Sequence, residues 1–157
     1  MTDPVGTERT MMRSQTKAGR WTPPSVEHAL VVPEFVFEMW ERRHCVVLTT
    51  VGSGRPHSSL MWFEPAPAHV LFSTVIGRRK YEDILSNPNV SMLFHPDGDW
   101  NRYLELRGTA RLGGDGRAAI NRMYSHFRSP GAYPWDGADD HRIEIIVDIR
   151  KSLSFGG

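Results

Sequence analysis

The sequence predicts a mainly β domain, a β-barrel with short helices, and three observations lead to this prediction. The chain has 157 residues, of which 39% are hydrophobic, which is enough for one core. Six segments have the alternation or β-branched composition of strands, whereas three have helical spacing. The strands mostly follow one another through short turns, which favours an antiparallel barrel over a doubly wound parallel sheet.

The first half of the predicted barrel begins with an amphipathic helix and continues into a hairpin. Pro33 can occupy the first turn of a helix, and Val36 and Met39 follow it at helical spacing. β-branched residues then predict a strand, and the glycine-rich turn at 52–54 reverses the chain. The expected order is helix 33–43, strand 44–51, strand 56–63, a loop marked by Pro65 and Pro67, and strand 70–75.

The second half adds two helices and three strands. A short helix follows residue 80, with Tyr81, Ile84 and Leu85 expected on one face. Gly108 interrupts an alternating strand and predicts a bulge, and Asp115 can cap the helix that follows it. The remaining expected elements are strand 90–94, strand 103–112, a helix from Asp115 to about 128, the loop 129–141 that carries Tyr133 and Trp135, and a last strand over 143–150.

Bulk composition excludes several functional classes. The formal net charge is +1, so no overall field draws the protein to nucleic acid or to an acidic membrane surface. No apolar stretch approaches the roughly 20 residues needed to span a bilayer. The seven histidines show no HxxxH or HExxH pairing, so we expect no metal site. The one cysteine, Cys45, can form no internal disulfide, which indicates a cytoplasmic location.

The sequence divides into an N-terminal extension and one folded domain. Residues 1–30 are expected to be a flexible extension, and residues 31–157 are expected to form the barrel domain. The extension has no apolar core of the kind found in a secretory signal. A transit peptide is the weaker alternative for this segment, because no amphipathic apolar face is visible.

A basic triplet, Arg78-Arg79-Lys80, lies between a predicted strand end and a predicted helix start. The free amides of a helix N-terminus favour an anion, and arginine and lysine side chains suit a phosphate. Two hydroxyl residues, Ser73 and Thr74, precede the triplet and could also donate hydrogen bonds. The triplet therefore indicates a phosphate clamp, with a solvated basic patch as the alternative.

Two further segments could contact a planar ring. In the strand that ends near residue 62, Ser59 and Met61 share one face, while Ser58, Leu60 and Trp62 share the other. Such a strand can line a ring, or it can be an ordinary barrel strand. Trp100 follows a turn, where it can stack on a ligand or a partner subunit, or anchor the core.

The sequence contains no recognisable nucleophile elbow, calcium loop or GxxxxGK[ST] motif. The absence of an obvious acid, base or nucleophile fits an enzyme whose cofactor carries the chemistry while the protein binds and orients it.

Six motifs occur in a fixed order along the chain. They are Gly54-Arg55-Pro56-His57, Met61-Trp62-Phe63, Leu71-Phe72-Ser73-Thr74, Gly77-Arg78-Arg79-Lys80, Asn87-Pro88-Asn89-Val90 and Tyr103-Leu104-Glu105-Leu106-Arg107-Gly108-Thr109-Ala110. This ordered set resembles the pyridoxamine 5′-phosphate oxidase-like split β-barrel superfamily, and within it the actinobacterial branch that uses the deazaflavin coenzyme F420. The resemblance covers about residues 33–150.

The resemblance implies a homodimer with two cofactor sites at the subunit interface, and Trp100 reaching the cofactor from the other subunit. Many relatives carry proline after the serine that corresponds to Ser59, whereas Leu60 follows here. The residues that the resemblance assigns to the cofactor are His57, Ser58, Ser59, Leu60, Met61, Trp62, Ser73, Thr74, Arg78, Arg79, Lys80 and Trp100.

The resemblance implies an oxidoreductase that transfers a hydride between reduced F420 and an unsaturated organic substrate. His57 and Tyr103 are candidate proton donors for that reaction. Two alternatives stay open: an FMN-dependent oxidase or reductase, and a non-catalytic protein that binds flavin, haem or another tetrapyrrole.

Overall fold

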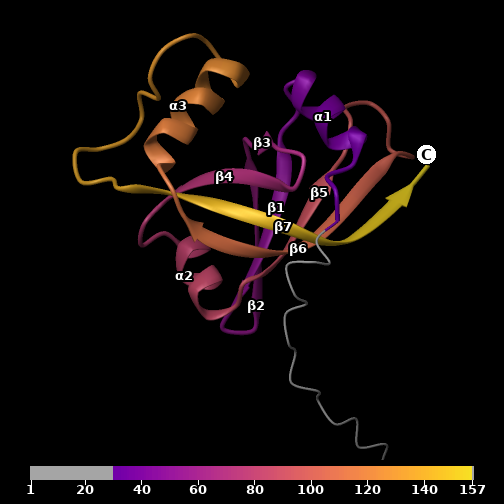
Figure 1. Cartoon of the computed structure of the whole chain (residues 1–157), viewed down its shortest axis with the longest axis horizontal. Coiled ribbons are helices and arrows are strands. Elements are labelled where there is room, and N and C mark those ends of the chain that lie inside the picture. Colours follow the sequence, from indigo (N-terminus) through magenta and orange to yellow (C-terminus); the bar gives the residue numbers. More distant parts are fainter. Residues whose placement is uncertain (1–29, 157) are drawn as a thin grey trace, which may run out of the picture.

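The computed structural model describes residues 30–156, and its central feature is one curved antiparallel sheet of seven strands with three short helices (Figure 1). The prediction of a mainly β split barrel is thereby confirmed. The flexible extension expected at residues 1–30 lies outside the described residues, except for Leu30. The amide of Leu30 donates to the carbonyl of Ile149 at 2.9 Å, which joins the start of the described chain to the sheet.

The elements follow one another in an order close to the predicted one. They are α1 (Glu34–Glu41), β1 (Val46–Gly52), β2 (Arg55–Met61), β3 (Glu64–Pro65), β4 (His69–Val75), α2 (Arg79–Ser86), β5 (Asn89–Phe94), β6 (Tyr103–Gly113), α3 (Gly116–Phe127) and β7 (Arg142–Phe155). The strands lie side by side in the order β2-β1-β5-β6-β7-β4-β3. Among the described residues, no helix is long and apolar enough to cross a membrane.

The main core contains alternate residues of β1, β5, β6 and β7, because successive side chains of a strand point to opposite faces of the sheet. The residues of β6 alternate as predicted, with Leu104, Leu106 and Ala110 buried. A second, smaller cluster forms where α3 packs against the other side of β4, around Leu71 and Met123. Figure 1 shows α1 and α3 above the sheet and α2 below it. The helices therefore cover different parts of the barrel.

The predicted bulge at Gly108 is confirmed by a register shift between Arg107 and Gly108 where β6 pairs with β7. A Cβ atom at Gly108 would collide with the backbone carbonyl of Asp148 and with a methyl group of Val147. Glycine is thus required here because the two strands approach too closely for any side chain.

Several element boundaries differ from the prediction. Pro33 is the N-cap of α1 rather than its first residue, and β1 begins only at Val46 because Arg43 turns the chain with a positive φ of 59°. Residues 64–65 were expected in a loop but form a short additional strand, β3. This strand lies at the edge of the sheet, where a proline is tolerated. The last strand continues to Phe155, because its polar end pairs with the start of β6.

Candidate functional site

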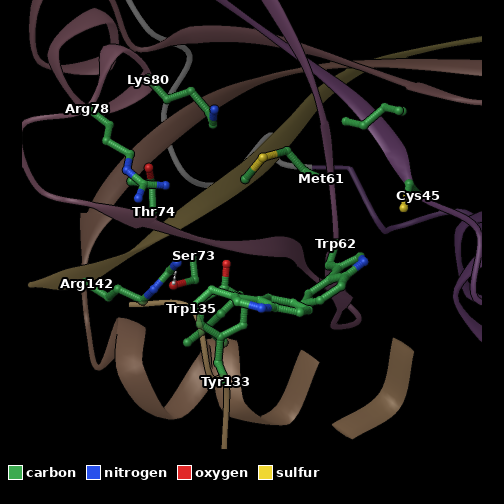
Figure 2. Close-up of a pocket in the computed structure, with 12 residues that line it drawn as sticks. Cys45, Met61, Trp62, Ser73, Thr74, Arg78, Lys80, Tyr133, Trp135 and Arg142 are labelled. Atoms are coloured by element: carbon green, nitrogen blue, oxygen red, sulfur yellow. Dashed lines mark hydrogen bonds between the residues drawn. The ribbon is translucent and has the colours of Figure 1, made fainter. Parts of the chain in front are cut away.

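Twelve residues line a pocket of about 340 Å³ between α2, α3 and the end of β2. Figure 2 shows Arg78 and Lys80 toward one side of this pocket. Trp62, Tyr133 and Trp135 lie toward the other side, next to α3. The lining residues are Cys45, Leu60, Met61, Trp62, Ser73, Thr74, Arg78, Lys80, Ile120, Tyr133, Trp135 and Arg142.

The cationic end of the pocket is built by the start of α2. Arg78 is the N-cap residue, and no side chain of the described residues caps the amides of this helix. Burial lowers the pKa of Lys80 below its usual 10.5, and the nearby charge of Arg78 lowers this pKa further, while Asp83 opposes the shift. An anion at this end would offset both effects, since it would neutralise two crowded cations.

The middle residue of the basic triplet turns away from the pocket. The guanidinium of Arg79 donates from Nε to Oδ1 of Asp83 at 3.0 Å, and the other carboxylate oxygen accepts from the hydroxyl of Thr50 at 2.8 Å. Both Thr50 and Asp83 are buried. A Cβ atom at Gly52 would collide with the Asp83 carboxylate. Asp83 therefore fixes α2 against β1 and sets the direction of its N-terminus.

The prediction of which face of α2 is buried was partly wrong. Ile84 is buried as expected, but Leu85 is 59% exposed and Asp83 occupies the inward position beside Ile84. The buried hydroxyl of Thr50 supplies the partner that lets a carboxylate replace an apolar side chain there.

The opposite end of the pocket is aromatic. Trp62 packs near Phe127 of α3, with ring centroids 5.8 Å apart, and meets the edge of Tyr133 at 6.1 Å. Trp135 meets the rings of Tyr124 at 5.7 Å and Tyr133 at 5.3 Å, both nearly perpendicular. We call Trp62, Tyr133 and Trp135 the aromatic shelf.

A buried ion pair anchors the loop 129–141, which carries two of the three shelf residues. Arg142 contacts both carboxylate oxygens of Asp136, at 2.6 and 2.9 Å, and Arg117 adds a contact at 2.7 Å. Hydrogen bonding from Arg142 lowers the pKa of Asp136 below its usual 3.8, against the opposing effect of burial. The Arg142 guanidinium also lies 4.7 Å from the Tyr133 ring centroid.

The hydroxyl of Ser73 is already engaged in this network. It donates to the carbonyl of Gly116 at 2.8 Å and accepts a hydrogen bond from Arg142 at 3.3 Å. Ser73 lines the pocket, but its hydroxyl proton is held by the protein. Thr74 is therefore the hydroxyl that is better suited to donate to an anion.

Cys45 lies on the rim of the pocket, at the end away from α2 (Figure 2). Burial raises the pKa of its thiol above the usual 9.0; the charge of Arg128 opposes this shift and Asp97 adds to it. The thiol is consequently protonated at neutral pH and is a weak nucleophile.

Seven of the residues predicted for the cofactor site come together in this one pocket. They are Leu60, Met61, Trp62, Ser73, Thr74, Arg78 and Lys80. Arg79 points to Asp83, and His57, Ser58 and Ser59 lie farther back along β2 without lining the pocket. Ser58 bonds to Thr49 at 2.8 Å, and the buried hydroxyl of Ser59 has no hydrogen-bond partner among the described residues.

Trp100 and Tyr103 also lie outside the lining of the pocket. Trp100 is 83% exposed, and its ring is tilted against His95 at 5.3 Å. Tyr103 stacks on Phe155 at 5.4 Å beside a different cavity. Neither of the two predicted proton donors, His57 and Tyr103, lines the pocket.

Five lining residues were not predicted as site residues: Cys45, Ile120, Tyr133, Trp135 and Arg142. Tyr133 and Trp135 could have been singled out in the sequence as two aromatic residues in a loop rich in proline and glycine. Arg142 carries no such signal, because its position depends on the pairing of β4 with β7.

Comparison with known proteins identifies the family of the chain. Residues 32–140 match the family model described as pyridoxamine 5′-phosphate oxidase. The chain belongs to this family. No curated protein sequence matches the chain.

Solved structures of the pyridoxamine 5′-phosphate oxidase-like fold resemble the chain over most of its length. A structure named F420 reductase is 30% identical, with a TM-score of 0.67, covering 78% of this chain and 98% of its own. The general stress protein 26 from Bacillus anthracis is 22% identical with a TM-score of 0.59, covering 78% of this chain and 92% of its own. A conserved hypothetical protein from Mycobacterium tuberculosis is 17% identical with a TM-score of 0.62, covering 86% and 89%. At these two lower identities the likeness concerns the fold alone.

Proposed function

We propose that this member of the family is an oxidoreductase that uses coenzyme F420 to reduce an unsaturated organic substrate. The observation that carries the proposal is a single pocket with a cationic end at Arg78 and Lys80 and an aromatic end at Trp62, Tyr133 and Trp135. The 30% identity to a structure named F420 reductase supports the choice of deazaflavin.

The residues at the cationic end fit a phosphate-bearing cofactor. Arg78, Lys80 and Thr74 offer two positive charges and one hydroxyl, and the uncapped amides of α2 add further donors. The lining of the pocket includes no carboxylate, so a phosphate there would meet no negatively charged side chain directly. Arg78, Lys80 and Thr74 would hold the phosphate, while Leu60, Met61 and Trp62 would lie along the ring.

When bound, reduced F420 would supply a hydride, and the substrate would gain that hydride and one proton, so that a double bond is reduced by two electrons. The protein's part is to hold the substrate against the cofactor and to exclude water. Solvent is one source of the proton. Within one protomer the lining groups with exchangeable protons include the Tyr133 hydroxyl and the Cys45 thiol.

The proposal includes a homodimer whose interface completes the site, with Trp100 contributed by the other subunit. Leu60, Leu93 and Trp100 are exposed apolar side chains, at 72%, 38% and 83%. A second cavity lined by Leu93 and His95 shares Leu60 and Cys45 with the cofactor pocket. An apolar surface that adjoins the pocket is typical of an interface.

A cytoplasmic location for the protein agrees with its single cysteine.

The test is a parallel fluorescence titration of the purified protein with F420 and with FMN, combined with sedimentation. Micromolar or tighter binding of F420 alone by a dimer is the expected result. Preference for FMN would move the protein to an FMN-dependent oxidase or reductase. Binding of neither, together with a Soret band after addition of haem, would indicate a tetrapyrrole carrier. A stable monomer that binds F420 tightly would contradict the role given to Trp100.

A further inference from the structure

Arg79 belongs to the basic triplet but is held outside the pocket. Its neighbours Arg78 and Lys80 line the pocket, whereas Arg79 does not. The guanidinium of Arg79 donates from Nε to Oδ1 of Asp83 at 3.0 Å. The Arg79 side chain is 52% exposed, so the carboxylate, rather than close packing, sets its direction. The pocket therefore receives two of the three positive charges that the sequence places together.

Asp83 is fixed by contacts with a distant part of the chain. Its side chain is 5% exposed, and its Oδ2 accepts a hydrogen bond from Thr50 of β1 at 2.8 Å. A Cβ atom at Gly52 would collide with this carboxylate, so β1 passes directly against it. Burial and then the charge of Arg78 lower the pKa of Lys80, whereas Asp83 raises it. The charge of Asp83 therefore acts on the cationic end of the pocket although Asp83 does not line it.

The number of charges at the cationic end affects two kinds of phosphate ester differently. Above its second pKa of about 6, a phosphate monoester carries two negative charges, whereas a diester carries one. Coulomb energy is proportional to the product of the charges, so the removal of a cation weakens the binding of a dianion twice as much as that of a monoanion. The phosphate of F420 is a diester and that of FMN is a monoester. A carboxylate that neutralises and diverts one cation thus shifts selectivity toward the diester.

We infer that Asp83 is a positioning residue that, through Arg79, shifts the selectivity of the phosphate clamp from monoesters toward diesters. The inference rests on the proposed function, because it concerns the same clamp at Arg78 and Lys80. It adds the class of phosphate ester that the clamp selects, and it assigns part of a preference for F420 over FMN to the phosphate rather than to the ring.

The experiment compares the 5′-phosphate of the F420 chromophore, a monoester, with its methyl ester, a diester that has the same ring and side chain. Fluorescence titration at about pH 8 and low ionic strength gives the ratio of the two affinities in the full-length protein. The variants are Asp83→Asn, Arg79→Gln, the double variant Asp83→Asn/Arg79→Gln, and Thr50→Val. Thr50→Val is the matched control, because it removes the other hydrogen bond to the same carboxylate and leaves every charge in place. Methyl phosphate and dimethyl phosphate, followed by phosphorus NMR, form a second pair of ligands without a ring.

We expect Asp83→Asn to raise the affinity for the monoester relative to the diester about 3-fold, the scale of one added charge acting across several ångströms of aqueous surroundings. Arg79→Gln should lower this relative affinity by a similar factor, and it tests the inference even if Asp83→Asn does not fold. The double variant should restore the wild-type ratio, because it has the wild-type net charge. Thr50→Val should leave the ratio unchanged.

Unchanged ratios in Asp83→Asn and Arg79→Gln would overturn the inference. A shift in Thr50→Val as large as that in Asp83→Asn would overturn it too, because the ratio would then report the position of α2 rather than its charge. Failure of the wild type to bind either deazaflavin ester would refute the proposed function instead, and the two ligands without a ring would still report on the clamp. If the protein bound neither of those, the clamp itself would be absent and the inference would be overturned.

Discussion

Asp136 and Arg142 form a two-point ion pair that is almost completely inaccessible to solvent. The contacts measure 2.6 and 2.9 Å, and the side chains are only 3% and 4% exposed. The pair connects the loop that presents Trp135 to the first residue of β7. A buried charge that loses its partner is strongly destabilising, so this pair couples the shape of the pocket to the stability of the fold.

Replacement of Asp136 by Asn should therefore destabilise the protein. We expect a loss of about 3–5 kcal/mol in the free energy of unfolding, because the buried guanidinium of Arg142 loses its counter-charge. Urea denaturation monitored by tryptophan fluorescence measures this loss. Asp139→Asn is the matched control, since Asp139 is an exposed residue of the same loop. Equal stability of the two variants would show that the ion pair contributes nothing.

The Asp136–Arg142 ion pair also predicts that the stability of the fold depends on pH. The pKa of Asp136 is lowered in the folded protein, chiefly by the hydrogen bonds from Arg142. Its stabilising contribution is thus fully present above the pKa of about 3.9 in the unfolded chain, and it is lost as the pH falls through the lower folded-state pKa. In urea titrations below about pH 4, the wild type should lose stability more steeply than Asp136→Asn. Parallel curves for the two proteins would contradict this assignment.

Lys80 should contribute directly to cofactor binding. Its replacement by Ala is expected to weaken F420 binding by about 1–3 kcal/mol, the scale of a charge-assisted contact. Fluorescence titration gives the affinity. Lys151→Ala is the control, because Lys151 is an exposed lysine of β7 outside the pocket. A loss of the same size in both variants would indicate a general charge effect rather than a specific contact.

The pH dependence of F420 binding should also report the protonation of Lys80. Burial, followed by the charge of Arg78, lowers the pKa of this ammonium group below 10.5. Affinity should therefore be highest at lower pH, where Lys80 is charged, and should fall as the pH rises through the lowered pKa. A bound phosphate raises this pKa again, so binding in that window should take up protons. Calorimetry in two buffers of different ionisation enthalpy measures the uptake, which should disappear in Lys80→Ala.

Cys45 offers a chemical probe of pocket occupancy, because it is the one cysteine of the chain and lines the pocket. Burial raises the pKa of its thiol above 9.0, so alkylation by iodoacetamide should be slow at neutral pH and accelerate in alkaline buffer. Saturating F420 should slow the reaction further. Mass spectrometry follows the labelling, with urea-unfolded protein as the reference for an unhindered thiol. Equal labelling rates with and without bound F420 would place the cofactor away from Cys45.

The strands that alternate strictly were the most predictable part of the fold. The predicted inward face of β6 is buried as expected, at Leu104, Leu106 and Ala110, because alternation with period two needs no knowledge of the neighbouring strands. The polar end of β7 escaped prediction, since residues such as Ser152 and Ser154 form a strand only through pairing with β6. The inward position of Asp83 depends likewise on Thr50, which lies far from it in the sequence.

The grouping of side chains in the pocket was predictable where those residues are close together in the sequence. Thr74, Arg78 and Lys80 lie within a few positions of each other, and the structure brings them to one pocket. Arg79 could not be distinguished from its neighbours, because its direction is set by Asp83 one helical turn later. The aromatic shelf is assembled from a strand end and a distant loop, which local patterns do not reveal.

The two edges of the sheet, β2 and β3, are consecutive in the chain and separated only by Trp62 and Phe63. The opening between them is therefore bridged by covalent linkage rather than by ladder hydrogen bonds. Phe63 is fully buried and anchors this bridge, while its neighbour Trp62 lines the pocket. A residue inserted beside Trp62 would lengthen this link without removing any strand pairing of β2 or β3.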